Sequence, residues 1–130
     1  MNDAQTTVAD LKQLVDEFVA EREWERYHDA KNLSMALAIE AAELMEHFQW
    51  TRNDELAELL ADEARRAEIA DEMADVACFL LSLSSALSVD LAAAVEQKMV
   101  KNRAKYPADQ FRGHYERPSA SGSSEAPPAE

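Results

Sequence analysis

The first 106 residues of this chain contain neither glycine nor proline. The only glycines are Gly113 and Gly122, and the first proline is Pro107. Phosphate-binding loops, dinucleotide-binding fingerprints and nucleophile elbows all need glycine, so none of them can lie in that stretch. The usual residues of tight β-hairpins are missing as well, whereas the helix formers Ala, Leu and Glu are abundant. The sequence therefore predicts an all-α protein.

Apolar residues recur at helical spacing through this stretch and predict four helices. The expected helices cover about residues 7–26, 32–50, 55–88 and 90–106. Asn32 is expected to cap the second helix, and a break is expected in the third near Asp62. Pro107 is expected to end the fourth, because the residue before a proline disfavours helical backbone. Together these elements predict a four-helix bundle.

The composition changes after Pro107. Residues 108–130 are rich in Ser, Pro, Gly, Ala and Glu and hold few side chains that a core could bury. Such a composition is typical of a disordered segment. We therefore expect one folded domain over residues 1–107 and a disordered tail over residues 108–130.

The charge balance excludes one class of partner. The chain carries 26 acidic and 13 basic side chains, a formal net charge of −13 at pH 7. A surface of that charge repels the phosphates of DNA and RNA, so we expect no nucleic-acid polymer as a partner. A small anionic ligand stays compatible with this charge if a cation accompanies it.

Cysteine content and hydropathy indicate the compartment. Cys78 is the only cysteine, which excludes an intrachain disulfide and a thiolate metal cage. The N-terminal residues are polar, and the longest nearly apolar run, residues 76–87, is shorter than the roughly 20 residues that span a bilayer. We expect a soluble cytoplasmic protein with no membrane partner.

Two acidic pairs interrupt the apolar faces of the second and third predicted helices. Glu40 lies within a leucine stripe of the second helix, and Glu43 lies at the edge of that stripe. Glu72 and Asp75 are placed in the same way on the third helix. The apolar stripe of the third helix consists of Ile69, Met73, Val76, Leu80 and Leu83. Each pair therefore sits where a helix normally presents hydrophobic residues to a core.

A divalent cation would explain this placement. An unpaired buried carboxylate is unfavourable, and four converging acids repel one another. Mg²⁺ prefers oxygen ligands and keeps part of its shell for water or substrate phosphates, so the sequence predicts a Mg²⁺ site, with Mn²⁺ as an alternative. A di-iron bundle is disfavoured because it needs Glu-x-x-His pairs, and the third helix has no histidine. The other open interpretation is a solvated groove in which the acids pair with Arg65 and Arg66.

The fourth predicted helix carries the opposite charge. Lys98, Asn102 and Lys105 share one of its faces, where they could bind phosphate or simply neutralise the dipole at the helix C-terminus. Trp24 and Trp50 lie near the ends of the first two helices. They could stack on a base or cover the core.

The third predicted helix is apolar on almost every side between residues 76 and 87. A helix that is hydrophobic all round has to be buried all round. Three neighbouring helices cannot cover it completely, so a second copy of the chain is expected to supply the rest. We expect Cys78 and Leu81 to be buried against other helices.

The motifs Glu40-Ala-Ala-Glu43 and Glu72-Met-Ala-Asp75, in that order, come with FQW and KxxxNRxxYP. In this combination the sequence resembles the MazG-like all-α nucleoside triphosphate pyrophosphohydrolases, most of all their dCTP pyrophosphatase branch. The resemblance covers about residues 7–107.

The resemblance implies a four-helix MazG-like bundle that forms a homodimer or homotetramer, with each active site at a subunit interface. It implies Mg²⁺-dependent cleavage of a nucleoside triphosphate to the monophosphate and pyrophosphate. It also implies site residues. The implied metal-binding and catalytic residues are Glu40, Glu43, Glu72 and Asp75. The implied substrate-binding residues are Trp24, His28, Lys31, Asn32, Trp50, Phe79, Lys98 and Asn102.

Two positions depart from the family pattern. Phe79 stands where close relatives often carry Tyr, and Val15 stands where some carry His. The preferred nucleobase therefore stays open between dCTP, a modified dCTP, dUTP and a broad range. A protein of a different class, a non-catalytic helical oligomeric adaptor, would keep the fold without the activity.

Overall fold

The computed structural model describes residues 1–113, and in this part of the chain the regular secondary structure is entirely helical. The all-α prediction is thereby confirmed. The elements are α1 (Val8–Ala20), the 3-10 helix η1 (Glu25–Tyr27), α2 (Ala30–Glu46), α3 (Leu56–Ala61), α4 (Glu63–Ala86), α5 (Leu91–Lys105) and α6 (Ala108–Phe111). The described chain forms two compact units, Met1–Val95 and a second that begins at Glu96.

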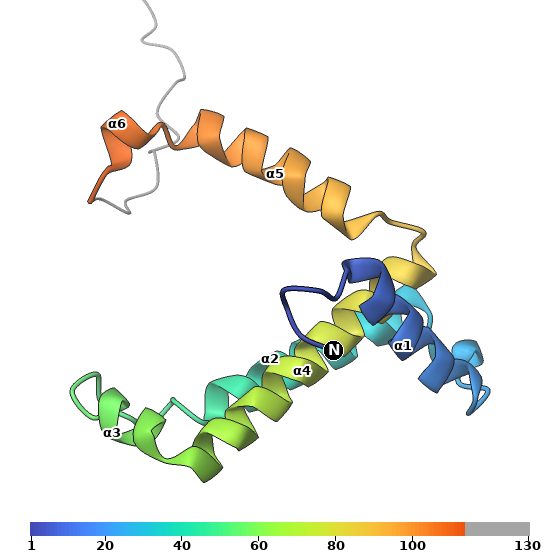
Figure 1. Cartoon of the computed structure of the whole chain (residues 1–130), viewed down its shortest axis with the longest axis horizontal. Helices are drawn as coiled ribbons and strands as arrows, with labels where there is room; N and C mark the ends of the chain where they lie inside the picture. The colour runs from blue at the N-terminus through green and yellow to red at the C-terminus, as the bar shows by residue number, and fades with distance from the viewer. Residues whose placement is uncertain (114–130) are drawn as a thin grey trace, which may run out of the picture. The chain divides into compact units, whose positions relative to one another are not determined.

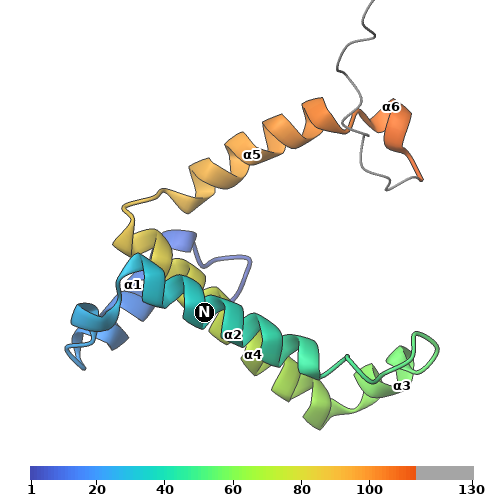
Figure 2. The same cartoon turned by 180° about the vertical axis from the view of Figure 1, so that it is seen from behind.

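In the first unit, α2 lies along α4, as both views of the molecule show (Figures 1 and 2). Helices α1 and α3 also pack on α4. The Ser85 hydroxyl donates a 3.0 Å hydrogen bond to Asp16 Oδ2 and so joins α4 to α1. The buried apolar side chains are Val19, Leu33, Ile69 and Leu81, of which Leu33 is fully buried. Helix α4 is thus the element on which the unit is assembled.

The helix boundaries differ from the expected ones chiefly at the end of the first helix and at both ends of the second, which ends at Glu46 rather than near residue 50. The first helix ends at Ala20 rather than near residue 26, since the chain turns back through Glu23, whose φ is 52°. The second begins at Ala30, and its N-cap is Asp29 rather than Asn32. Both residue types cap helices well, but only Asp29 has the extended backbone of a cap here. Its Oδ1 accepts a 2.8 Å hydrogen bond from the backbone N–H of Asn32.

We expect that replacing Asp29 with alanine will lower the free energy of unfolding by about 1 kcal/mol, because the first turn of α2 loses its side-chain acceptor. Urea denaturation of the wild type and the variant would measure this difference. Asp29→Asn is the matched control, since asparagine caps equally well and should keep most of the stability. Equal losses in both variants would contradict the capping role.

The buried stripe predicted for α4 is only partly correct. Leu81 is buried and Cys78 is half-buried, but Met73 and Leu80 are 58% and 39% exposed in the protomer. Leu87, seven residues after Leu80, is 53% exposed. Within one chain the prediction is therefore wrong for Met73 and Leu80, because α1, α2 and α3, the helices that pack on α4, leave these two side chains exposed.

Pro107 ends α5, as predicted, but the chain then makes a further short helix, α6. Phe111 of α6 packs edge-to-face against Tyr106, with ring centroids 5.2 Å apart. This turn lies in the segment predicted to be a tail. The rest of the predicted tail, residues 114–130, is outside the described residues.

Over residues 1–113, no helix taken alone has both the length and the apolar character needed to cross a membrane. The bent pair of α4 and α5 passes the same test by length and composition.

Candidate functional site

Three of the four acids singled out in the sequence come together where α2 lies along α4. Glu40 and Glu43 are on α2, and Glu72 is on α4. One carboxylate oxygen from each lies within 4.8 Å of the others. The spacing i, i+3 puts the two α2 acids on one side of that helix, and the packing of α4 brings the third to them.

The environment of these acids is unfavourable without a cation. Glu72 Oε2 is buried and has no hydrogen-bond partner among the described residues. Burial raises the pKa of Glu40 above its ordinary value of 4.5, and the charges of Glu43, Asp75 and Glu72 raise it further. Such a cluster fits a divalent cation, since positive charge offsets the repulsion and supplies a partner for the buried oxygen.

Asp75 stands apart from the other three acids. It is exposed on α4, three residues after Glu72, and it does not belong to the group of three whose oxygens lie within 4.8 Å. Its negative charge nevertheless contributes to the raised pKa of Glu40, so it lies within electrostatic range of the cluster.

The raised pKa of Glu40 has a consequence for stability. The carboxyl group of Glu40 holds its proton more tightly in the folded state than in the unfolded chain, where its pKa is about 4.5. Protonation of Glu40 therefore stabilises the folded state below pH 4.5, and this stabilisation is lost as the pH rises through the raised pKa of the folded state. We expect the melting temperature of the metal-free wild type, relative to that of Glu40→Gln, to fall over this range. Thermal melts of both proteins in a chelator, from about pH 4 to pH 7, would measure it. A difference that does not change with pH would contradict the assignment.

The residues expected to bind the nucleoside are distributed over the start and end of α2 and over α4. Trp24 precedes η1, and the half-buried His28 follows it. Lys31 is exposed in the first turn of α2, and Trp50, after its end, is 87% exposed. Phe79 is half-buried on α4.

Asn32 makes a contact within the chain. Its Nδ2 donates a 3.2 Å hydrogen bond to the carbonyl oxygen of Tyr27. Its side-chain amide therefore ties the end of η1 to the first turn of α2.

Lys98 and Asn102 lie on α5 in the second unit. They are four residues apart, which places them on the same face of the helix. Lys98 is exposed and Asn102 is half-buried.

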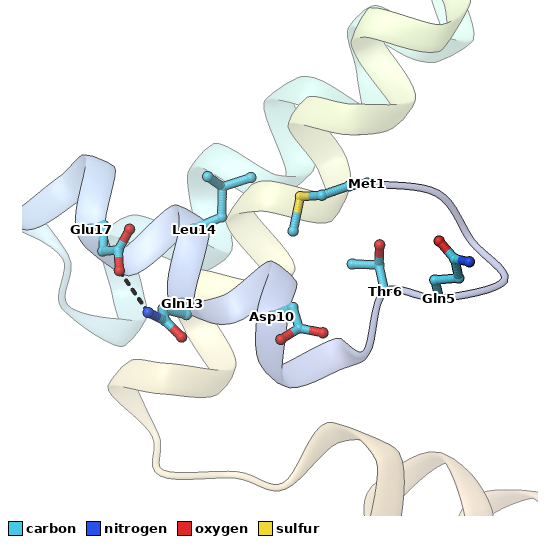
Figure 3. A pocket seen from close by; sticks show the side chains of 7 residues that line it. All are labelled: Met1, Gln5, Thr6, Asp10, Gln13, Leu14 and Glu17. Carbon is cyan, nitrogen blue, oxygen red and sulfur yellow. Dashed lines mark hydrogen bonds between the residues drawn. The ribbon is translucent and has the colours of Figure 1, made fainter.

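Three cavities in the first unit do not coincide with the acidic cluster. The cavity shown in Figure 3 has a volume of about 340 Å³ and lies between the N-terminal segment and α1. Its lining consists of Met1, Gln5, Thr6, Asp10, Gln13, Leu14 and Glu17. A second cavity, of about 320 Å³, lies beside α3. A third, of about 570 Å³, lies between the start of α1 and the loop after α4. None of the four candidate acids lines any of these three cavities.

Comparison with known proteins points to one family. The family model described as MazG-like matches residues 35–117. The chain is 38% identical to dCTP pyrophosphatase 1 of Bos taurus over 110 residues, which cover 85% of this chain and 65% of that protein. It is 41% identical to dCTP pyrophosphatase 1 of Homo sapiens over 102 residues, which cover 78% of this chain and 60% of that protein. The chain thus spans less than two thirds of the length of these curated relatives.

A solved structure is similar to this chain over a larger share of its own length. The crystal structure of a pyrophosphatase from Archaeoglobus fulgidus superimposes with a TM-score of 0.73 at 41% sequence identity. The match covers 82% of this chain and 98% of the archaeal one.

Proposed function

This chain belongs to the MazG-like family, and from that premise we propose that it is a nucleoside triphosphate pyrophosphohydrolase. Its substrate would be dCTP or a modified dCTP, and its products the nucleoside monophosphate and pyrophosphate. The two relatives described above are named dCTP pyrophosphatases and the similar archaeal structure a pyrophosphatase, which supports this reaction class.

The observation that carries the proposal is the convergence of Glu40, Glu43 and Glu72, together with the buried Oε2 of Glu72, which has no hydrogen-bond partner within residues 1–113. An all-oxygen donor set of this kind suits Mg²⁺ or Mn²⁺ better than iron or zinc. We assign Glu40, Glu43 and Glu72 as ligands together with Asp75, which lies one turn further along α4. A bound divalent cation would supply positive charge against the triphosphate and stabilise the negative charge that builds up on its oxygens.

The remaining chemistry is assigned to side chains of the chain itself. A water molecule attacks the α-phosphorus, the bond from that phosphorus to the oxygen bridging to the β-phosphate breaks, and pyrophosphate leaves. One carboxylate of the cluster accepts the proton of the attacking water. Lys98 and Asn102 would bind the phosphates.

We assign recognition of the nucleoside to the residues around the start and end of α2. Trp24 and Trp50 are the candidates for stacking on the base. His28, Lys31, Asn32 and Phe79 complete the proposed pocket. Because Phe79 has no hydroxyl group, it cannot donate a hydrogen bond to a phosphate or a base.

We propose that the protein acts as a homodimer or homotetramer in the cytoplasm, without nucleic-acid or membrane partners. The exposed apolar stripe formed by Met73 and Leu80 of α4 and by Leu87 at its C-cap supports a further copy of the chain as its cover.

Pyrophosphate release from a panel of canonical and 5-modified nucleoside triphosphates, with Mg²⁺, with Mn²⁺ and with a chelator, tests the proposal. We expect release that depends on the metal and is fastest with a cytosine nucleotide. Faster release of pyrophosphate from dUTP would contradict the assignment of dCTP as substrate in favour of dUTP. Similar rates with all bases would contradict it in favour of a broad-specificity enzyme. A folded protein that releases no pyrophosphate from any of them would overturn the enzymatic function in favour of a non-catalytic helical adaptor.

A further inference from the structure

The chain leaves α1 through a tight turn that fixes the backbone of Trp24. The N–H of Glu23 donates to the carbonyl oxygen of Ala20 at 3.0 Å, and the N–H of Trp24 donates to that of Val19 at 3.1 Å. Glu23 takes the left-handed conformation, with a φ of 52°, at a position where helices usually end in glycine. A non-glycine residue there is under strain, so the contacts that follow it must stabilise the turn.

The side chains of this turn form one stacked group. The Trp24 ring packs edge-to-face against Phe18, with centroids 5.9 Å apart and planes at 77°. The Arg22 guanidinium lies 3.7 Å from the centre of the Phe18 ring. Arg22 Nη1 also donates to the carbonyl oxygen of Phe18 at 2.9 Å and to Glu21 Oε2 at 3.2 Å. Phe18 is therefore held by Arg22 and in turn holds the indole of Trp24.

This group does not belong to the core. Phe18 is 49% exposed and Trp24 is 45% exposed, so about half of each side chain stays open to a partner. A large aromatic ring that is about half exposed and packed against a second ring is suited to stack on a planar ligand, because its orientation is set before binding.

We propose that Phe18 and Arg22 are positioning residues that hold the indole of Trp24 as a preformed stacking surface for the nucleobase. The identity of the ligand rests on the proposed function. The orientation of the indole rests on the contacts of α1 and its terminal turn alone, so it can be measured without any nucleotide.

The first experiment measures this orientation. The chain has two tryptophans, so Trp50→Phe leaves Trp24 as the only one. In that background we expect Phe18→Leu to weaken the near-UV circular dichroism of the indole and to increase its quenching by acrylamide, with unchanged far-UV spectra. Phe18→Tyr should restore both signals, since it keeps the aromatic ring.

The second experiment measures the consequence for substrate, with Trp50 intact. We expect Phe18→Leu to raise KM for dCTP about fivefold while kcat changes less than about twofold, because the aromatic contact affects binding rather than the reacting phosphates. Arg22→Gln should shift KM in the same direction, and it keeps the proposal testable if Phe18→Leu does not fold. Leu14→Ala is the matched control, since it removes another exposed apolar side chain of α1 outside this group and should leave KM unchanged.

The outcomes separate this inference from the proposed function. If the circular dichroism and quenching of Trp24 are unchanged in Phe18→Leu and in Arg22→Gln, both made in the Trp50→Phe background, the positioning role is overturned, whatever the substrate is. An altered signal with an unchanged KM overturns its connection to nucleotide binding. If the wild type hydrolyses no triphosphate, the proposed function fails and the stacking of a nucleobase falls with it, whereas an altered Trp24 signal would still support the role of Phe18 and Arg22 in orienting the indole.

Discussion

Replacing Glu72 with glutamine is expected to lower pyrophosphate release by more than about 100-fold while leaving the helices folded. Glutamine keeps the shape of the side chain but removes the negative charge that we assign to holding the divalent cation. The same result is expected for Glu40→Gln, because both residues contribute oxygens to the group that lies within 4.8 Å.

These two variants should also be more stable than the wild type in the absence of metal. The charges of Glu43, Asp75 and Glu72 raise the pKa of Glu40, which means that the metal-free cluster is repulsive. Removing one charge relieves this repulsion, and we expect the melting temperature in a chelator to rise by about 3 °C. Loss of activity together with a gain in stability is a combination that a folding defect does not produce.

Glu46→Gln is the matched control for both measurements. Glu46 is an exposed acid on the same helix as Glu40 and Glu43, and it is not part of the acidic group. We expect this variant to keep the wild-type rate and melting temperature. Wild-type turnover of Glu72→Gln at saturating Mg²⁺ would contradict the assignment of the cluster as the metal site.

The acidic cluster could be predicted from the sequence because its members break a pattern. A glutamate at position 40 or 72 is conspicuous only where leucine or valine is expected, and the helical period alone places it on the face of a neighbouring helix. The distances could not be predicted in the same way, because they depend on how α2 lies along α4. The structure accordingly brings Glu40, Glu43 and Glu72 together and leaves Asp75 outside that group.

The errors have physical causes of the same kind. No glycine or proline marks the end of α1, since Glu23 takes the left-handed position and the Phe18–Trp24 contact accompanies it. Because the sequence did not show where α1 ends, it did not predict the proposed role of Phe18 and Arg22 in orienting Trp24. Their spacing of four residues, which brings two side chains together on one face of a helix, was a usable signal. The cap of α2 was misplaced because Asp29 and Asn32 are both good capping residues, and only the backbone conformation decides between them.

The exposed stripe of α4 leads to the prediction about assembly. Met73, Leu80 and Leu87 recur every seven residues and are all exposed in the protomer. A spacing of seven keeps side chains on one face of a helix and is typical of helices that pack against a further helix. Leu81, by contrast, is buried inside the protomer, so a charge at that position would unfold the chain rather than test an interface.

Leu80→Glu is therefore expected to dissociate the proposed oligomer into folded monomers. A carboxylate buried without a partner at the interface should weaken association by more than about 100-fold, whereas in the monomer it would stay in water. Because we propose that two subunits complete each site, activity should fall with the molecular mass measured by light scattering. Leu60→Glu introduces the same charge at an exposed apolar residue of α3 and should leave mass and activity unchanged. A wild-type or Leu80→Glu monomer with full activity would contradict a shared site, because one chain would then bind and cleave the substrate alone.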